Sequence, residues 1–365
     1  MRVIISGGGS GGHVFPAIAI ADALKKMVPN VEILFVGAKG KIEMEKVPKA
    51  GYSIKGLWIS GFHRKNLKRN LLFPIKLFDS LIKASAIIRK FKPDLVIGVG
   101  GFASGPVLQM ASRRGIPTLI QEQNSYPGIT NRLLAKKVSK ICVAYPGMNK
   151  YFPDDKIVLT GNPVRLDITN LKIDKEDAIG FFELAQDRKT LLLFGGSLGA
   201  RTLNMAVKKA EELLSNHPEV QLIWQMGGLY ADEYSKCGTA KLQNVKPMAF
   251  IDRMDMAYAA ADLVICRAGA LAIAELATVG KPVLLVPSPN VAEDHQTKNA
   301  EVLKDRQAAE LVSDAEAVDQ LLKRALSLVK DEERCKQLRI NIKKFSSADA
   351  AENIAKQAMM LIEEK

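Results

Sequence analysis

The chain has little cysteine and no long apolar run. Its four cysteines are scattered, with no CxxC pair and no histidines beside them, at Cys142, Cys237, Cys266 and Cys335. This spacing argues against a disulfide scaffold and a zinc site, and it predicts reduced thiols in a cytosol. No apolar stretch approaches the roughly 18 to 20 residues of a membrane-spanning helix. The first strand-like stretch, Val3–Ile5, leads directly into glycines, a pattern that does not fit a signal peptide.

Aromatic residues are also few, at 6% of the chain, so platforms for stacking nucleic-acid bases are scarce. The sequence contains no helix-turn-helix, zinc-finger or RNP-like signature. The formal net charge is nevertheless +13, from 52 Lys and Arg against 39 Asp and Glu. Because a basic surface attracts anionic partners, we expect anionic lipid or a phosphorylated substrate, and no nucleic acid.

Strand-like and helix-like stretches alternate along almost the whole chain, a pattern typical of βαβ units around a parallel sheet. The 365 residues exceed what one hydrophobic core usually supports, so two domains are expected. Asn162-Pro163 follows a strand-like stretch and marks the expected junction. A C-terminal helix is expected from about Ala348 to Glu364, where apolar residues recur at helical spacing.

The two halves of the chain follow the same plan. Three pairs of similar segments occur in the same order, 29–37 with 218–227, 93–101 with 261–269, and 115–120 with 280–285. A fourth pair consists of a glycine-rich turn after the first strand-like stretch of each half, at 7–13 and 195–200. These repeats predict an α/β fold with two Rossmann-like domains.

Each glycine-rich turn joins a strand to a helix. Such a turn exposes backbone N–H groups at the positive end of the helix dipole, where phosphate binds. The first turn satisfies GxGxxG, but the second strand ends at Gly37-Ala38 without the acidic residue that a dinucleotide ribose needs. A P-loop is excluded because His13 and Val14 replace its lysine and its hydroxyl residue. Two such turns predict two nucleotide-type domains with a diphosphate substrate in the cleft between them.

His13 stands at the start of the helix that follows the first turn. On one interpretation its ring caps the turn or packs on Phe15. On the other it lies beside a diphosphate, where the helix dipole favours the neutral imidazole that can accept a proton.

The motifs resemble those of the MurG family, the N-acetylglucosaminyltransferases of glycosyltransferase family 28 that make lipid II for peptidoglycan. The resemblance runs from residue 1 to the C-terminal helix. The segments that carry it, in family order, are 8–16, 100–106, 121–124, 161–165, 195–201 and 266–270.

This resemblance implies a GT-B fold, in which two Rossmann-like domains with parallel sheets face each other across a cleft. It implies an N-terminal acceptor- and membrane-binding domain at 1–163, with a C-terminal helix at about 345–365 packing back on it. It implies a UDP-GlcNAc-binding domain at 164–344.

The implied reaction is an inverting transfer of N-acetylglucosamine from UDP-GlcNAc to the C4 hydroxyl of the muramyl sugar of lipid I. Lipid I is undecaprenyl-pyrophosphoryl-MurNAc-pentapeptide, and the products are lipid II and UDP. The resemblance also implies that no metal is obligatory and that no other cofactor is needed. The sequence is consistent with this, since no DxD-like pair ends a strand and Asp154-Asp155 lies in a loop. Helix N-termini and an arginine would then supply the positive charge.

For the donor, the resemblance assigns Ser197 to the phosphates, although the residue alone could equally be an N-cap. Glu275 falls in the second turn of a helix that starts after Gly269, and its carboxylate can accept from both ribose hydroxyls. The other donor-binding residues implied are Ser10, Gly11, Gly12, Asn124, Arg165, Ile251, Ala270, Leu271, Gln296 and Asn299. His295 stands where some members have a second glutamine, so its role stays open.

For the acceptor, the resemblance places the lipid diphosphate on the two glycine-rich loops of the first domain. The residues implied are Gly12, His13, Gly100, Gly101, Ser104 and Gly105. His13 and Asn124 are implied as catalytic, with His13 as the general base and Asn124 orienting the sugars. Glu122 is a second candidate for the base.

Residues 61–92 carry nine basic residues against the single acid Asp79. A stripe at Leu77, Leu81, Ala84 and Ile88 fits a core-facing helix. Further apolar and basic residues exceed what that stripe needs and form a predicted membrane patch, consisting of Lys68, Arg69, Leu71, Phe73, Ile75 and Phe78. Such a cluster suits contact with anionic lipid, and burial in the core is the alternative.

Taken together, the residues and the resemblance predict a peripheral enzyme at the cytoplasmic face of the bacterial cell membrane. The expected partners are UDP-GlcNAc, lipid I and an anionic membrane surface. The alternatives are a UDP-GlcNAc 2-epimerase or a different lipid glycosyltransferase of the same fold, an NAD-dependent oxidoreductase, and a non-catalytic sensor of nucleotide sugars.

Overall fold

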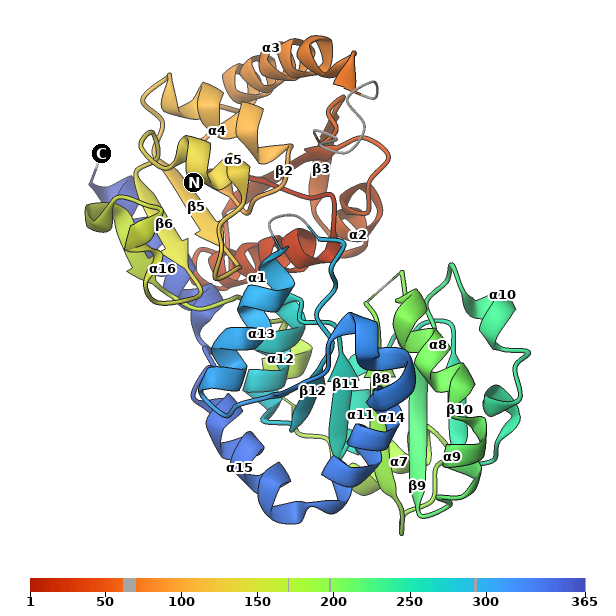
Figure 1. The fold of residues 1–365 in the computed structure, drawn as a ribbon. Helices are drawn as coiled ribbons and strands as arrows, with labels where there is room; N and C mark the ends of the chain where they lie inside the picture. The colour runs from red at the N-terminus through yellow and green to blue at the C-terminus, as the bar shows by residue number, and fades with distance from the viewer. Residues whose placement is uncertain (62–69, 170, 197, 292–293, 365) are drawn as a thin grey trace. The chain divides into compact units, whose positions relative to one another are not determined.

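The computed structural model describes residues 1–61, 70–169, 171–196, 198–291 and 294–364. The chain divides into two compact units, coloured along the chain in Figure 1. Unit 1 comprises Met1–Arg165 and Ser347–Lys365, and unit 2 comprises Leu166–Ser346. Ser197, Lys68 and Arg69, all predicted site residues, lie outside the described residues.

Unit 1 is built on a seven-stranded sheet in the order β3-β2-β1-β4-β5-β6-β7, and every pairing is parallel. The strands are β1 Arg2–Ser6, β2 Glu32–Ala38, β3 Ser53–Leu57, β4 Leu95–Gly98, β5 Thr118–Glu122, β6 Lys140–Val143 and β7 Ile157–Leu159. The central strands are apolar at successive positions because helices cover both faces of the sheet.

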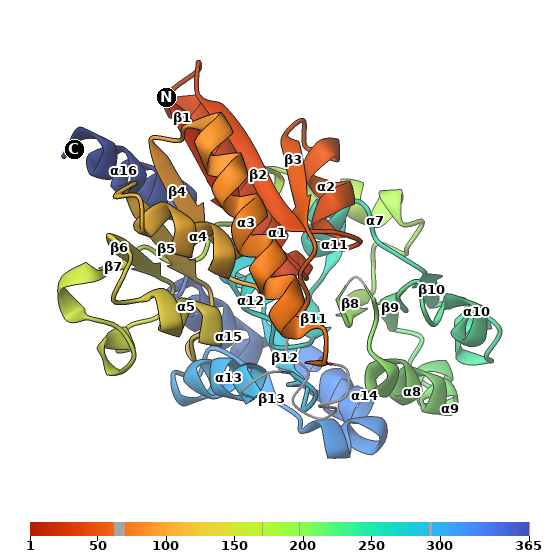
Figure 2. The ribbon, with the colours of Figure 1, turned by 90° about the horizontal axis from the view of Figure 1, so that it is seen from above.

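The helices of unit 1 form two layers. They are α1 Gly11–Met27, α2 Glu43–Lys49, α3 Phe73–Phe91, α4 Ser104–Ser112, α5 Ile129–Leu134 and α16 Ala350–Glu363. Ile4 of β1 packs with α3, α4 and α5, whereas its neighbours Val3 and Ile5 pack with α1 and α16. Figure 2 shows α3 and α4 side by side over the sheet.

The last helix, α16, is far from α1 in the sequence but packs against it in unit 1. Ile354, Ala358 and Leu361 share a buried cluster with Ile20 and Leu24 of α1. An ion pair between Lys26 and Glu352, with nitrogen and oxygen 2.7 Å apart, lies at the surface of this contact. The chain therefore returns to unit 1 after completing unit 2.

Unit 2 has a six-stranded parallel sheet in the order β10-β9-β8-β11-β12-β13. The strands are β8 Lys189–Phe194, β9 Val220–Gln225, β10 Val245–Met248, β11 Leu263–Cys266, β12 Val283–Leu285 and β13 Glu310–Leu311. Each segment pair that the sequence showed to be similar takes the same place in its sheet, as β1 with β8, β2 with β9, β4 with β11 and β5 with β12. The prediction of two Rossmann-like parallel sheets is confirmed.

The helices of unit 2 connect these strands across both faces of the sheet. They are α6 Leu166–Thr169, α7 Lys175–Phe181, α8 Arg201–Lys209, α9 Glu211–Ser215, α10 Ala231–Tyr234, α11 Met254–Ala260, α12 Ala270–Val279, α13 His295–Asp305, α14 Asp314–Lys330 and α15 Glu332–Lys343. Leu191, Leu193 and Trp224 of the sheet pack with α8 and α14 in one buried cluster. Within the described part of the chain, no helix is both long enough and apolar enough to cross a membrane.

Candidate active site

The two glycine-rich loops of unit 1 lie together, because they follow the adjacent strands β1 and β4. Their backbones touch. A Cβ atom at Gly101 would lie 2.4 Å from the carbonyl oxygen of Gly8, and Gly101 has a φ of +80°. Only glycine allows this approach without strain. The predicted acceptor loops are thus brought to one edge of the sheet, at the carboxyl ends of its strands.

A buried carboxylate holds the first loop. Glu43, at the start of α2, is 1% exposed, and its Oε2 accepts a hydrogen bond from the Gly9 amide at 2.9 Å. Its Oε1 accepts from the Ala38 amide at 2.9 Å. A Cβ atom at Gly8 would lie 2.2 Å from the Glu43 carboxyl carbon. Part of the glycine pattern at 7–9 is therefore required by Glu43, a residue that the sequence analysis missed.

The amino end of α1 leaves backbone N–H groups that could bind an anion. Gly11 and Gly12 open this 17-residue helix, so their N–H groups have no intrahelical partner. Ser10 is the N-cap residue, but its side chain makes no capping bond. Its hydroxyl instead lies 3.1 Å from Nδ1 of His13. The hydroxyl of Ser10 and the imidazole of His13 thus form a pair.

The His13 ring lies against the second loop. A Cβ atom at Gly100 would be 3.0 Å from Nε2 of His13. The ring is half-buried, while Gly100 beneath it is buried. This arrangement brings His13 and Gly100, both predicted acceptor-binding residues, into contact within unit 1.

Ser104 and Gly105 open α4, after the second loop. Ser104 is fully buried, and its hydroxyl donates to the carbonyl of Gly101 at 2.9 Å. Gly105 is half-buried. In this structure the hydroxyl of Ser104 therefore stabilises the turn, and the backbone of the loop is the part that can meet a ligand.

Glu122, the second candidate base, is buried at the carboxyl end of β5. Its Oε1 accepts from the backbone and side-chain amides of Asn124 at 3.0 and 3.3 Å. Its Oε2 accepts from the side chain of Asn131 at 2.8 Å and from the Gly128 amide at 3.1 Å. Burial raises the pKa of Glu122, and these donors oppose the rise. Both carboxylate oxygens of Glu122 therefore support the segment at 124–131, which ends within α5.

Arg165 is the last residue of the first segment of unit 1. Its guanidinium carbon lies 5.5 Å from the centre of the Phe15 ring on α1. This distance fits a cation–π contact. Arg165 therefore lies against α1, the helix that follows the first glycine loop of unit 1.

Unit 2 contains a cavity of about 370 Å³ at the carboxyl ends of its strands. It is lined by Phe194, Gly195, Gly196, Gly199, Ala200, Arg201, Thr202, Tyr230, Arg267, Gly269, Ala272, Ser288, Asn290 and Gln296. Among these described residues, two arginines carry charge and none is acidic. The amino ends of α8 and α12 also meet the cavity, through Arg201 and Gly269. Both features favour an anionic ligand.

The two arginines of the cavity differ in their surroundings. Arg267 donates through Nη1 to the carbonyls of Val286 and Pro287 and to the carboxylate of Asp314, so it braces the cavity wall. Arg201 is exposed at the first position of α8. The sequence analysis quoted both residues within motifs but gave neither a role.

Glu275 lies on α12, as predicted, and is 6% exposed. Its Oε2 accepts a hydrogen bond from the hydroxyl of the buried Tyr258 at 2.8 Å. Ala270 is buried and Leu271 is half-buried in the first turn of the same helix. Gly269 before them and Ala272 after them line the cavity, so this helix end belongs to the site.

Three further predicted donor residues lie elsewhere in unit 2, two on α13 and one after β10. Gln296 lines the cavity, and its Oε1 accepts from the Ser288 amide at 2.9 Å, which fixes the side chain. Asn299 is buried one turn later on α13, 3.4 Å from the Ala268 carbonyl. Ile251 is 3% exposed, and its amide donates to Oε1 of Gln225 at 3.0 Å. His295, whose role the sequence left open, begins α13 and is half-buried.

The predicted membrane patch falls on α3 and the residues before it. Leu71, Ile75 and Phe78 are 83%, 58% and 68% exposed, whereas Phe73 is half-buried. Leu72 and Ile82, absent from the prediction, are 50% and 55% exposed. The opposite side of α3 contributes Ala84 and Ile88 to the core. For Leu71, Ile75 and Phe78, burial in the core of unit 1 is thereby excluded.

Comparison with known families identifies both halves of the chain. Residues 3–143 match the glycosyltransferase family 28 N-terminal domain, and residues 190–354 match the C-terminal domain of the same family. The chain is 52% identical over its full length to a protein of Christiangramia forsetii and 51% identical to one of Bacteroides fragilis, covering 99% and 96% of them. Each of these relatives is a UDP-N-acetylglucosamine--N-acetylmuramyl-(pentapeptide) pyrophosphoryl-undecaprenol N-acetylglucosamine transferase.

Solved structures agree with this relationship. The crystal structure of MurG from Acinetobacter baumannii covers 98% of the chain, and the chain covers 99% of it, with a TM-score of 0.75 and 27% identity. A putative UDP-N-acetylglucosamine 2-epimerase from Listeria monocytogenes has a TM-score of 0.73 at 14% identity, with 100% and 97% coverage, and so shares the fold alone. The fold is therefore the two-domain GT-B fold, and the chain belongs to the MurG family of glycosyltransferases, within glycosyltransferase family 28.

Proposed function

We propose that this glycosyltransferase moves N-acetylglucosamine from UDP-GlcNAc to the C4 hydroxyl of the muramyl sugar of lipid I, with inversion, giving lipid II and UDP. The proposal rests mainly on sequence identity. About half of all residues, over the whole chain, are identical to those of transferases whose names state this donor and acceptor. The epimerase alternative has weaker support, because it rests on a shared fold at low sequence identity.

The donor site in this proposal is the cavity of unit 2. Its two arginines, its lack of acidic lining among the described residues and the amino ends of two helices suit a diphosphate. Glu275 on α12 would accept from the ribose hydroxyls, and Gln296 would contact the sugar. UDP leaves with negative charge on its diphosphate, and the same groups would stabilise that charge as it develops.

The acceptor site is the pair of glycine loops in unit 1. The N–H groups of Gly11 and Gly12 would hold the lipid diphosphate, with His13 beside it. As the general base, His13 takes the proton of the C4 hydroxyl while its oxygen attacks the anomeric carbon and the bond from that carbon to UDP breaks. This role requires the tautomer in which Nδ1 carries the hydrogen and donates to Ser10, because Nε2 then keeps its lone pair.

We also propose that unit 1 contacts an anionic membrane surface and that the enzyme works as a peripheral protein at the cytoplasmic face. Unit 1 carries 28 Lys and Arg against 13 Asp and Glu, whereas unit 2 carries 24 against 26. The excess of basic over acidic residues thus lies in unit 1, which also bears the exposed apolar residues of α3. Each basic residue near an anionic surface contributes about 1 kcal/mol, so the charge and the apolar patch support the same contact.

An assay of radiolabelled UDP-GlcNAc with a lipid I analogue tests the proposal. The expected result is a labelled disaccharide on the lipid, dependent on the acceptor, and no free ManNAc from UDP-GlcNAc alone. Release of ManNAc without acceptor would favour the epimerase. Binding of UDP-GlcNAc without any transfer would favour a sensor, and a thermal shift with NAD but not with UDP would favour an oxidoreductase.

A further inference from the structure

The side chain of Gln225 makes hydrogen bonds to two loops of the unit 2 site. It is the last residue of β9, the strand that lies between β8 and β10, and it is 3% exposed. Its Nε2 donates to the carbonyl of Gly196 at 3.0 Å, and its Oε1 accepts from the amide of Ile251 at 3.0 Å. A carbonyl only accepts and an amide N–H only donates, so the two partners fix the orientation of the Gln225 side chain.

The two loops have separate parts in the proposed function. Gly196 belongs to the glycine turn after β8 and lines the cavity, on the side expected to meet the diphosphate. Ile251 follows β10 and is one of the donor-binding residues that the resemblance implies. One primary amide of fixed length therefore sets the spacing between these two parts of the site.

We propose that Gln225 is a positioning residue that fixes the register between the diphosphate turn and the backbone of Ile251, and that nucleotide affinity depends on this register. The inference rests on the proposed function, because it assumes that this cavity takes a uridine nucleotide.

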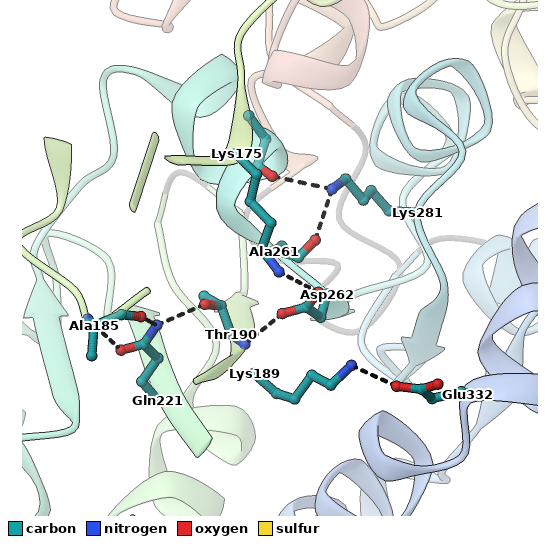
Figure 3. A network of polar contacts seen from close by, with 10 residues as sticks. Lys175, Ala185, Lys189, Thr190, Gln221, Ala261, Asp262, Lys281 and Glu332 are labelled. Carbon is teal, nitrogen blue, oxygen red and sulfur yellow. Dashed lines mark hydrogen bonds and ion pairs between the residues drawn. The ribbon is translucent and has the colours of Figure 1, made fainter. Parts of the chain in front are cut away.

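The same strand provides a matched control. Gln221, at the other end of β9, is also buried, and its side-chain amide bonds the backbone of Ala185 and the hydroxyl of Thr190 (Figure 3). These contacts lie at the amino end of the sheet, away from the cavity. Q221M removes a buried glutamine amide from β9 without touching the site, whereas Q225M removes the one between the two loops.

The test is calorimetric titration of the full chain with UDP. We expect Q225M to weaken UDP binding by roughly tenfold, because the Gly196 carbonyl and the Ile251 amide lose their hydrogen-bond partner. Q221M should stay within about twofold of the wild type, whatever its thermal stability. Equal UDP binding by Q225M and the wild type, or an equal loss in Q221M, would overturn the inference. Failure of the wild type to bind UDP would instead overturn the proposed function.

Q225E is the second variant, and it is informative even where Q225M folds poorly. Its carboxyl group keeps an oxygen for the Ile251 amide but can donate to the Gly196 carbonyl only when protonated. We expect affinity for UDP to fall at neutral pH and to recover as the pH is lowered, relative to the wild type at each pH. A Q225E whose UDP affinity follows the wild type at every pH would contradict the positioning role.

Discussion

The hydroxyl of Tyr258 donates to Oε2 of Glu275 at 2.8 Å, and both side chains are buried in unit 2. The hydrogen bond joins α11 to α12 and orients the carboxylate that we propose to bind the ribose. Tyr258 is thus a support for the donor site that the sequence analysis did not find.

We predict that Y258F weakens UDP-GlcNAc binding by about 0.5–1.5 kcal/mol, because Glu275 loses one hydrogen bond, and that E275A weakens it by about 1–3 kcal/mol. Calorimetric titration of each variant measures the effect. Y145F is the control, since Tyr145 is a buried tyrosine of unit 1. Donor affinity that is unchanged in E275A would remove Glu275 from the site.

His13 and Ser10 form the pair on which the proposed base catalysis depends. We predict that H13A lowers turnover by roughly 10²–10⁴ while donor affinity changes little, because the proton acceptor is lost. S10A should have a smaller effect of the same kind, since it removes only the partner of Nδ1. Steady-state kinetics with a soluble acceptor measures both. Near-normal turnover of H13A would exclude His13 as the base.

Glu43 supports the first glycine loop by accepting hydrogen bonds from two backbone N–H groups. We predict that E43Q lowers the free energy of unfolding by about 1–3 kcal/mol, since its NH₂ group must face one of the two backbone N–H donors. It should also raise KM for the acceptor and leave UDP affinity unchanged. E45Q, on the exposed side of the same helix, should change stability by no more than about 0.5 kcal/mol. A normal acceptor KM in a folded E43Q would show that the loop does not depend on Glu43.

The exposed residues of α3 give a prediction about the membrane. Replacing Leu71, Ile75 and Phe78 together with serine should reduce binding to vesicles that contain anionic lipid, because the apolar contact is lost. A short-chain soluble acceptor should still react at close to the wild-type rate. Vesicle flotation and the soluble assay measure the two effects. Equal loss in both would mean that these side chains stabilise the fold.

Lys281 gives a prediction about stability and pH. Its Nζ donates to the carbonyls of Ala259 and Ala261 at 3.2 and 2.8 Å, within the polar network of Figure 3. Burial lowers the pKa of Lys281 from 10.5 to about 8. Between these two pH values the unfolded chain binds more protons than the folded chain, so the contribution of Lys281 to stability rises with pH.

The variant K281M isolates this effect. The difference in unfolding free energy between the wild type and K281M should rise in favour of the wild type by up to about 3 kcal/mol from pH 8 to pH 10.5. Below pH 8 the difference should be constant. Denaturant unfolding at several pH values measures it. A difference that does not vary across this window would contradict a lowered pKa.

The fold could be predicted from the sequence because its signals are local. Strands buried on both faces are apolar along their length, glycines mark the turns that follow them, and the order of these features repeats in both halves. The exposed apolar side of α3 could also be predicted from a local pattern. Its apolar residues Ile75, Phe78 and Ile82 recur at helical spacing opposite Ala84 and Ile88, although the prediction omitted Ile82.

The supports of the site could not be predicted, because their partners are distant in the sequence. Glu43 bonds an amide 34 positions earlier, and Gln225 bonds an amide 26 positions later. Neither residue belongs to a motif or a periodic pattern, and only the adjacency of strands in the sheet brings each pair together. Glu122 shows the reverse case, since its residue type fits a base but its four hydrogen bonds fit a loop support.

A crystal structure with UDP-GlcNAc bound tests the central claim most directly, that the cavity of unit 2 holds the donor. We predict the diphosphate beside Gly196 and the amino end of α12, the ribose within hydrogen-bonding distance of Glu275, and the sugar beside Gln296. A nucleotide bound elsewhere on the protein, with this cavity empty, would contradict the account.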